Sequence, residues 1–312
     1  MTLASRATDY ISILFLICNM HNIVRFAIFG NSLQTIAQDA LAVLWNELKV
    51  HKTHIAIDKD FFLACDNLPS NIMPDELIEG NDFEADLVFC IGGDGTFLEA
   101  ARRVGNKQIP IMGVNTGRLG FLADFAPFDL KRVVQDVFEG KFVIENRSLI
   151  QVETYGGDIK GYPFALNEVA VLKHDMSSMI DIDVHVNGEH LTTYRADGLI
   201  VCTPTGSTGY ALSVGGPVIV PQAGIFGITP VAPHSLNVRP ITMNDDAVIE
   251  LSVTSRSHNF MVAIDGRSES CNEGCKLVLR KAPYSVRVFQ RKNHSFFATL
   301  RNKLMWGADS RS

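Results

Sequence analysis

The sequence has no hydrophobic run long enough to cross a membrane. The longest run near the N-terminus, Ile11 to Cys18, is interrupted by Ser12, whereas a membrane helix needs about 20 apolar residues. The flanking residues Arg6 and Asp9, with no convincing small-residue cleavage site, argue against a signal peptide. We therefore expect no membrane partner, and a disordered N-terminal extension over residues 1–22, with Met20 as an alternative start.

Cysteine is scarce and scattered. The chain has six cysteines, without the regular spacing of a disulfide framework, at Cys18, Cys65, Cys90, Cys202, Cys271 and Cys275. The pair in CNEGC could indicate a metal or redox site, but no second Cys or His pair with zinc-like spacing accompanies it. A turn between strands is favoured there, and we expect reduced thiols, a cytoplasmic protein and no protein-built metal site.

Positive charge is also scarce. The chain has 28 Lys and Arg against 34 Asp and Glu, which gives a formal net charge of -6. The sequence has no polybasic segment of the kind that binds nucleic acid or an anionic membrane. Any anionic ligand must therefore be bound by a local site.

The first part of the chain alternates apolar runs with helical patterns, which is typical of α/β domains. The expected strand and helix pairs are 23–29 with 32–48, 85–91 with 96–104, and 109–114 with 130–139. Strands this apolar are expected to be parallel and buried on both faces. We predict a Rossmann-like α/β domain with a parallel sheet over residues 23–141.

After Lys141 the pattern changes to closely spaced strands, which predicts a mostly-β, β-sandwich-like domain over residues 142–284. Asn187-Gly188 favours a tight turn between strands at 181–186 and 189–194, because both residues tolerate positive φ. Residues 285–312 read as a strand and a helix, which we expect to pack back on the first domain.

A glycine-rich loop joins the second strand and helix of this alternation. The segment Gly92-Gly93-Asp94-Gly95 follows an apolar run and leads directly into a helical pattern. Thr96 and Glu99 have the spacing of a capping box, so the helix is expected to begin at Thr96. Its free N–H groups would make this loop an anion site. The glycine spacing matches neither the P-loop nor the GxGxxG fingerprint.

Asp94 is the unexpected residue in this loop, because a carboxylate repels phosphate. It could handle a metal ion or accept a proton from a nucleophilic hydroxyl, and phosphoryl transfer needs both functions. The alternative is an Asp-Gly turn without chemistry.

Longer motifs resemble those of the NAD kinase family. They are GGDGT with FLEAAR, GVNTGRLGFL at 113–122, LNEV at 166–169, YRADGLIVCTPTGSTGYALSVGGP at 194–217, VAPHSLNVRP at 231–240 and HSFFATLRNKLMWG at 294–307. The resemblance covers most of residues 23–307. It implies a kinase that phosphorylates the adenosine-ribose 2′-hydroxyl of NAD with ATP, giving NADP and ADP.

The resemblance also implies roles for individual residues. Asp94 would be the catalytic proton acceptor. The NAD-binding residues would be Asp94, Gly95, Asn167, Glu168, Asp197, Thr208, Gly209, Tyr210, Ala211, Leu212, Ser213 and Ala232.

Phosphate contacts are expected from the loop and from two arginines. These are Gly92, Gly93, Gly95 and Thr96, with Arg102 and Arg118, whose guanidinium groups can bind phosphate in a two-pronged manner. Two positions depart from the family pattern: Val214 stands where alanine is expected, and Arg267 where glutamine is expected. The second departure could alter ligand contacts or regulation.

Two other functions compete with NAD phosphorylation. A lipid kinase of the diacylglycerol or sphingosine type shares GGDGT, and a nucleotide-sensing regulator could keep the pocket without turnover. The expected substrates are NAD and ATP, the expected cofactor is Mg²⁺ or another divalent cation, and the resemblance implies a homodimer or homotetramer. It implies further that residues of a neighbouring subunit lie near the dinucleotide.

Overall fold

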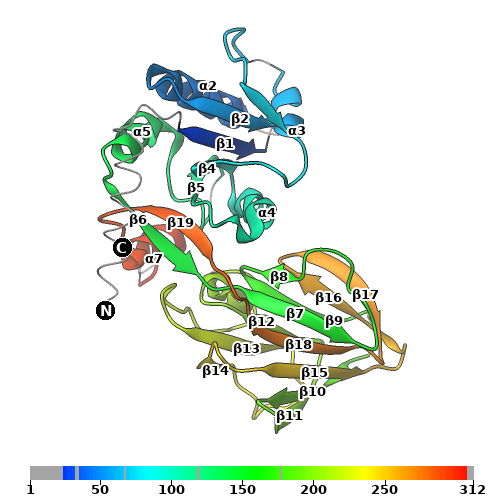
Figure 1. Cartoon of the computed structure of the whole chain (residues 1–312). Helices are drawn as coiled ribbons and strands as arrows, with labels where there is room; N and C mark the ends of the chain where they lie inside the picture. The colour runs from blue at the N-terminus through cyan, green and yellow to red at the C-terminus, as the bar shows by residue number, and fades with distance from the viewer. Residues whose placement is uncertain (1–23, 32–34, 67, 118–119, 176–177, 308–312) are drawn as a thin grey trace, which may run out of the picture. The chain divides into compact units, whose positions relative to one another are not determined.

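The computed structural model describes residues 24–31, 35–66, 68–117, 120–175 and 178–307. The chain forms two compact units (Figure 1). The first comprises residues 1–145 and 287–312, and the second comprises residues 146–286. The chain therefore leaves the first unit once and returns to it.

The first unit is built on a seven-stranded sheet with the order β3-β2-β1-β4-β5-β19-β6. Its strands are β1 (Arg25–Gly30), β2 (His54–Asp58), β3 (Glu76–Ile78), β4 (Leu87–Gly92), β5 (Ile111–Asn115), β6 (Phe142–Arg147) and β19 (Val286–Arg291). The pairings of β1 with β2 and β4, of β2 with β3, and of β5 with β4 and β19 are all parallel. The predicted parallel sheet is confirmed.

Helices cover both faces of this sheet, which explains why its central strands β1, β2, β4 and β5 are largely apolar. Phe26 and Ile28 of β1 belong to the core formed with α2 (Thr35–Val50) and α5 (Leu130–Phe138). Successive strand residues point to opposite faces. Phe29 therefore faces the other side, where Arg103 of α4 (Asp94–Val104) stacks on its ring.

Some elements of the first unit differ from the sequence-based expectation. The strand β2, the short helix α3 (Lys59–Leu63) and the strand β3 were not predicted. The predicted helical tail is confirmed as α7 (Phe296–Leu304), which belongs to the first unit. Short one-turn 3-10 segments, η1 (Gly105–Lys107) and η2 (Pro127–Asp129), complete this part of the chain.

The expected start of α4 was wrong by two residues. Gly93, with an extended backbone at φ -99 and ψ -169, is the N-cap, and Asp94 is the first helical residue. In the described part of the chain no side chain caps the helix, and Glu99 pairs with Arg102 instead of turning back to the N-terminus. Asp94 therefore stands at the positive end of the helix dipole, where a carboxylate is favoured.

The second unit is a sandwich of two six-stranded sheets. One has the order β11-β10-β15-β18-β7-β8 and the other β14-β13-β12-β9-β16-β17, and the neighbouring strands in both sheets are antiparallel. The strands are β7 (Ile150–Tyr155), β8 (Phe164–Ala165), β9 (Glu168–Lys173), β10 (Ile180–Val186), β11 (Glu189–Ala196), β12 (Gly198–Cys202), β13 (Ile225–Val231), β14 (Ile241–Asn244), β15 (Ile249–Thr254), β16 (Asn259–Ile264), β17 (Arg267–Asn272) and β18 (Lys276–Lys281). The predicted mostly-β domain is confirmed.

Two local predictions in this unit are also confirmed. Asn187 and Gly188 have φ of +53 and +82, and they join the antiparallel strands β10 and β11. Cys271 lies near the end of β17, Cys275 comes just before β18, and a turn joins the two strands. Both thiols are free and buried. The CNEGC segment is a turn between strands.

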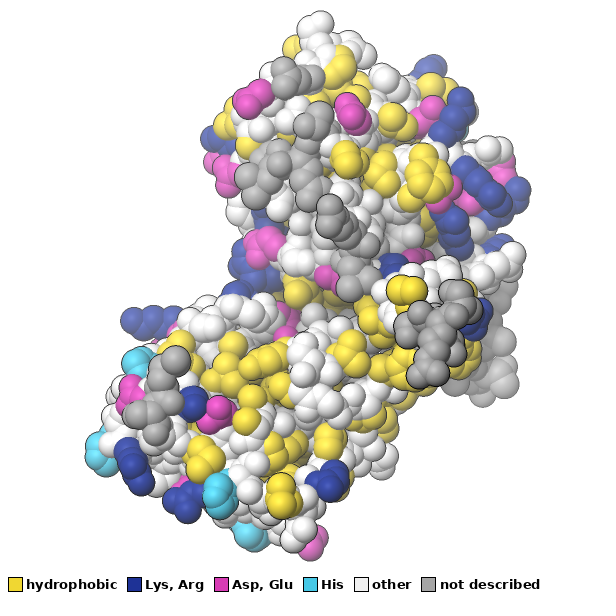
Figure 2. All heavy atoms as spheres, turned by 180° about the vertical axis from the view of Figure 1, so that it is seen from behind, with side chains coloured by type: hydrophobic (Ala, Val, Ile, Leu, Met, Phe, Trp, Pro, Cys, Tyr) yellow, Lys and Arg dark blue, Asp and Glu magenta, His cyan; other side chains and the backbone are white. Residues whose placement is uncertain are grey.

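The sheet that contains β12 is also apolar on the side away from the sandwich core. Ala170, Ile200, Cys202 and Ala211 form a small cluster there, with partly buried neighbours such as Leu172 and Val231. Hydrophobic side chains gather on the face of this unit that Figure 2 shows. Among the residues that the structure describes, no helix has both the length and the hydropathy to span a bilayer.

Candidate active site

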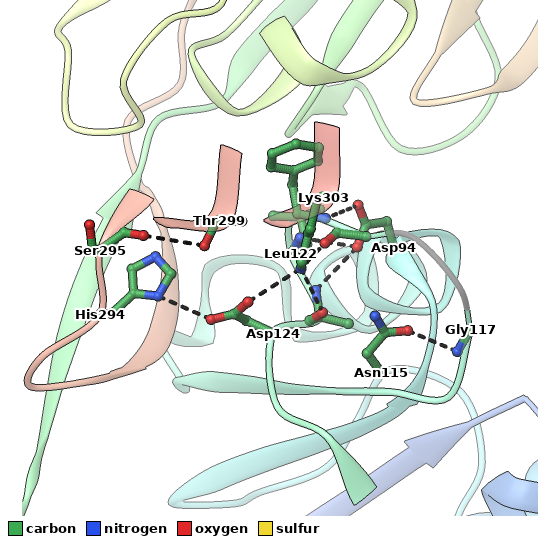
Figure 3. Close-up of polar contacts among 12 residues, drawn as sticks. Asp94, Asn115, Gly117, Leu122, Asp124, His294, Ser295, Thr299 and Lys303 are labelled. Atoms are coloured by element: carbon green, nitrogen blue, oxygen red, sulfur yellow. Dashed lines mark hydrogen bonds and ion pairs between the residues drawn. The ribbon is translucent and has the colours of Figure 1, made fainter. Parts of the chain in front are cut away.

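In the first unit, the candidate site is the N-terminus of α4 with the loop after β5. The Oδ2 atom of Asp94 accepts a hydrogen bond from the backbone N–H of Phe121 at 2.7 Å. Its Oδ1 atom accepts two, from Leu122 at 3.0 Å and Ala123 at 3.1 Å (Figure 3). A carboxylate offers about four acceptor positions, so with the donors that the described residues supply, Oδ2 keeps capacity for one more.

Gly120 allows this close approach. A Cβ atom at position 120 would lie 2.5 Å from Oδ1 of Asp94, a distance that real side chains do not adopt. Gly120 is buried, and sequence reasoning did not select it. The signal was present in GVNTGRLGFL, but the sequence cannot show which carboxylate this glycine faces.

The other residues of the glycine-rich loop surround the start of the helix. Gly92 ends the fully buried strand β4, Gly93 caps the helix, and Gly95 is exposed in its first turn. The first N–H groups of a helix have no partner within it. The loop can therefore offer backbone donors beside the Asp94 carboxylate.

Of the two arginines expected to contact phosphate, the structure describes one, Arg102. Arg102 lies two turns along α4, and its guanidinium forms hydrogen bonds with both carboxylate oxygens of Glu99. With Asp58, Lys59 and Arg103, it lines a cavity of about 410 Å³. Arg118 lies outside the described residues.

In the second unit, the candidate site is where β8 ends and β9 begins. The carboxylate of Asp265 accepts hydrogen bonds from the backbone N–H groups of Leu166, Asn167 and Glu168, at 2.7, 2.8 and 3.1 Å. Asp265 has a φ of +47 and, with Gly266, forms the turn between β16 and β17. Sequence reasoning missed Asp265, which fixes the segment that carries both expected ribose-binding residues.

The segment after β12 packs directly on Asn167 and Glu168. It contains η3 (Thr205–Thr208) and the short helix α6 (Tyr210–Ser213). A Cβ at Gly206 would lie 2.0 Å from the carbonyl oxygen of Asn167, so only glycine permits this contact. The backbone N–H of Tyr210 donates to the carboxylate of Glu168. The structure thus brings the predicted residues Asn167, Glu168 and Thr208–Ser213 together.

Glu168 is the electrostatically unusual group of this unit. Burial, followed by the nearby charge of Asp265, raises the pKa of Glu168 to about 7, although the N–H of Tyr210 opposes the shift. Its Oε2 atom is buried and has no hydrogen-bond partner among the described residues. A buried acceptor without a donor is costly, and a ligand hydroxyl could satisfy it.

Asp197 and Ala232 lie elsewhere in the second unit. Glu168 pairs with Cys202 at one end of β12, whereas Asp197 precedes Gly198 at the other end. At about 3.3 Å per residue, the two ends are roughly 15 Å apart. Asp197 forms an ion pair with Lys173 at 2.7 Å, and its N–H donates to Val231, the residue before Ala232.

Arg267, the departure from the expected pattern, has a structural contact in this conformation. Its guanidinium donates to the carbonyl oxygens of Tyr162 and Phe164, each at 3.0 Å. It therefore ties the strand β8 to the turn that carries Asp265. Val214, the other departure, follows α6 and packs on the outer apolar cluster.

Two family models together match most of the described chain. The ATP-NAD kinase N-terminal domain matches residues 24–142, and the ATP-NAD kinase C-terminal domain matches residues 166–290.

Individual NAD kinases are also similar to this chain over most of its length. The NAD kinase of Bacteroides fragilis is 55% identical over 290 residues, covering 92% of this chain and 100% of that protein. The NAD kinase of Porphyromonas gingivalis is 42% identical over 286 residues, covering 91% and 98%.

Solved structures share the fold. The crystal structure of yeast NADH kinase complexed with NADH matches with a TM-score of 0.83 at 20% identity, covering 93% of this chain and 89% of that one. An NAD kinase from Archaeoglobus fulgidus in complex with ATP matches with a TM-score of 0.71 at 25% identity, covering 89% and 99%. This chain belongs to the ATP-NAD kinase family.

Proposed function

We propose that Asp94 is the proton acceptor when the chain transfers the terminal phosphoryl group of ATP to NAD. The adenosine-ribose 2′-oxygen of NAD forms a bond to the γ-phosphorus, and the bond from that phosphorus to the β–γ bridging oxygen breaks. The hydroxyl proton passes to Oδ2 of Asp94, and the products are NADP and ADP. The observation that carries this proposal is the Asp94 carboxylate itself, oriented by three backbone N–H groups, of which one donates to Oδ2 among the residues that the structure describes.

The glycine-rich loop is proposed to bind phosphate. Gly92, Gly93, Gly95 and Thr96 surround the N-terminus of α4, whose free N–H groups and dipole favour an anion. Arg102 and Arg118 are proposed as further phosphate partners. Arg102 would have to exchange its pairing with Glu99 for a phosphate oxygen.

The second unit is proposed to bind NAD. Asn167 and Glu168 combine an amide with a carboxylate, which suits hydrogen bonds to ribose hydroxyls. A hydroxyl that donates to Oε2 of Glu168 would satisfy the buried acceptor. Thr208, Gly209, Tyr210, Ala211, Leu212 and Ser213 supply backbone donors, hydroxyls and the exposed ring of Tyr210 beside it.

Asp197 and Ala232 are proposed to serve the NAD site of a second copy in a homodimer or homotetramer. Their place at the far end of β12 from Glu168, and the apolar outer face of the same sheet, support this arrangement.

Mixing two inactive variants tests this arrangement. We expect Asp197→Ala and Glu168→Ala each to lose most activity, and a mixture of the two proteins to regain up to about a quarter of the wild-type rate, because some sites then receive both intact residues. A mixture as inactive as its components would contradict a shared site.

The divalent cation is proposed to arrive with the donor as MgATP. Among the described residues, no group of three or more His, Cys, Asp or Glu side chains could hold a metal ion. In this proposal the cation is bound together with the triphosphate of the substrate. We place the reaction in the cytoplasm, in keeping with the free thiols of the described cysteines.

A Gly120→Ala variant tests the seating of Asp94. Because the added Cβ would lie 2.5 Å from Oδ1, the carboxylate must move, and a displacement near 1 Å can cost about 100-fold in turnover. We expect kcat to fall at least about 10-fold. Gly117→Ala is the matched control in the same loop, since its Cβ would make an ordinary 3.5 Å contact with Asn115. Equal kcat values for the two variants would contradict this seating.

The activity itself is tested with purified protein, NAD, ATP and Mg²⁺, with NADP formation followed through an NADP-specific dehydrogenase. Parallel reactions replace NAD with diacylglycerol or sphingosine vesicles. NADP formation without lipid phosphorylation is the expected result. Phosphorylated lipid alone would support a lipid kinase, and tight NAD binding without turnover would support a nucleotide-sensing regulator.

A further inference from the structure

The three N–H groups that hold Asp94 belong to a loop with its own supports. The side-chain Nζ of Lys303, on α7, donates to the carbonyl oxygen of Gly120 and approaches that of Ala123 at 3.5 Å. Residues 121–123 donate to Asp94, and Lys303 therefore contacts the loop just before this segment, at Gly120, and at its end, at Ala123. These contacts all lie within the first unit (Figure 3).

Asp124 joins Lys303 to a second side chain from the C-terminal segment. Its Oδ1 atom lies 3.3 Å from Nζ of Lys303, and its Oδ2 atom lies 3.0 Å from Nδ1 of His294. Burial alone would raise the pKa of Asp124, but His294 and Lys303 outweigh it, so the pKa is lowered. The side chains are only 24%, 17% and 13% exposed for Asp124, Lys303 and His294. These pairings are therefore shielded from most solvent.

The back of the loop is also fixed. A Cβ at Gly113 would lie 2.5 Å from Cα of Ala123, so β5 packs directly on the loop. Phe125, the residue after Asp124, donates its backbone N–H to the carbonyl oxygen of Gly113 at 3.1 Å and accepts from the N–H of Asn115 at 2.7 Å. The loop is thus held by α7 and by β5 through contacts that do not involve Asp94.

The second unit offers an internal comparison. There, Asp265 also receives hydrogen bonds from three consecutive backbone N–H groups, and it sits in a tight turn between paired strands. At Asp94 the loop is the anchored partner. The carboxylate there takes the position that the loop dictates.

We propose that Lys303, with Asp124 and His294 behind it, is a positioning residue for phosphoryl transfer. Lys303 fixes the loop 120–124, and the loop fixes the Asp94 carboxylate in the orientation in which it accepts the proton. This inference rests on the proposed role of Asp94. Lys303 itself makes no contact with the reacting groups in the proposal, so its removal acts through the geometry of Asp94.

The test compares Lys303→Met with Arg301→Met, in which an exposed cation on the same helix loses its charge. Small misplacements of a catalytic group cost about 10- to 100-fold. We expect Lys303→Met to lower kcat by this factor, with KM for NAD and ATP within about twofold of wild type. Arg301→Met should match wild type. Asp124→Asn, which keeps the shape of the side chain, should reproduce the loss of kcat if Lys303→Met folds poorly.

A double variant separates this inference from the proposed function. On an Asp94→Asn background, Lys303→Met should lower kcat no further, because the residue that it positions is already lost. Full activity of Asp94→Asn would overturn the proposed function. If Asp94→Asn is inactive but Lys303→Met and Asp124→Asn keep wild-type kcat, or if the losses multiply in the double variant, the positioning role is overturned.

Discussion

An Asp94→Asn variant is expected to lose about 100- to 10,000-fold in kcat, the range typical of a removed general base. The asparagine side chain has nearly the same shape, so the loop 120–124 keeps its own supports from Lys303 and β5. The amide oxygen can still accept from Leu122 and Ala123, whereas the amide nitrogen would face the N–H of Phe121. One lost hydrogen bond costs about 1 kcal/mol, so folding should survive.

The matched control for this variant is Asp60→Asn, an exposed aspartate in the first turn of α3 in the same unit. It should retain wild-type kcat and thermal stability. A folded Asp94→Asn protein that keeps more than a tenth of the wild-type kcat would contradict proton transfer to Asp94. Unfolding of the variant at room temperature would instead assign Asp94 a structural role in fastening the loop.

A Glu168→Gln variant is expected to be more stable than wild type at pH 8 and weaker in NAD binding. Burial, then the charge of Asp265, raises the pKa of Glu168 from 4.5 to about 7. Between these values the folded protein holds a proton that the unfolded chain has released, so wild-type stability falls as the pH rises from about 4.5 to about 7. Glutamine removes this loss, which is on the order of 1–3 kcal/mol above pH 7.

Thermal unfolding at pH 5 and pH 8 measures this effect. The stability gain should appear at pH 8 and shrink toward zero at pH 5, while KM for NAD rises about 10-fold because a charged acceptor for ribose is lost. Glu189→Gln is the control, since Glu189 also begins a strand but is exposed. A variant that is no more stable than wild type at pH 8, or equally stabilised at both pH values, would contradict the raised pKa of the buried Glu168 carboxyl group.

The parts of the fold that depend on local pattern could be predicted from the sequence. Strands such as β4, buried at every position, read as apolar runs between helical patterns. Asn187-Gly188 specified its hairpin because few other residue pairs tolerate two positive φ angles. In contrast, β3 is only three residues long and partly exposed, so its sequence carries little periodicity.

The helix start at α4 shows where a local rule fails. Thr96 and Glu99 have the capping-box spacing, yet Asp94 begins the helix two residues earlier. The reason is long-range, because the loop 120–124 holds the Asp94 carboxylate and supplies it with three hydrogen bonds. A single-sequence pattern does not contain that partner.

The candidate site shows the same division. Asp94, Asn167 and Glu168 could be selected from motifs, and their roles remain proposals. Gly120, Asp265 and Lys303 act through contacts with residues 26, 98 and 183 positions away in sequence. Such pairings are set by the packing of sheets and helices, and nothing in the residue types alone links them.

The most direct test of the central claim is to locate the phosphate on the product. The protein is incubated with NAD, Mg²⁺ and ATP that carries a labelled γ-phosphate, and the dinucleotide product is cleaved at its pyrophosphate. Transfer to the adenosine-ribose 2′-hydroxyl predicts label in adenosine 2′,5′-bisphosphate, and almost none with Asp94→Asn. Label on the 3′-position, on the nicotinamide ribose or on no dinucleotide at all would contradict it.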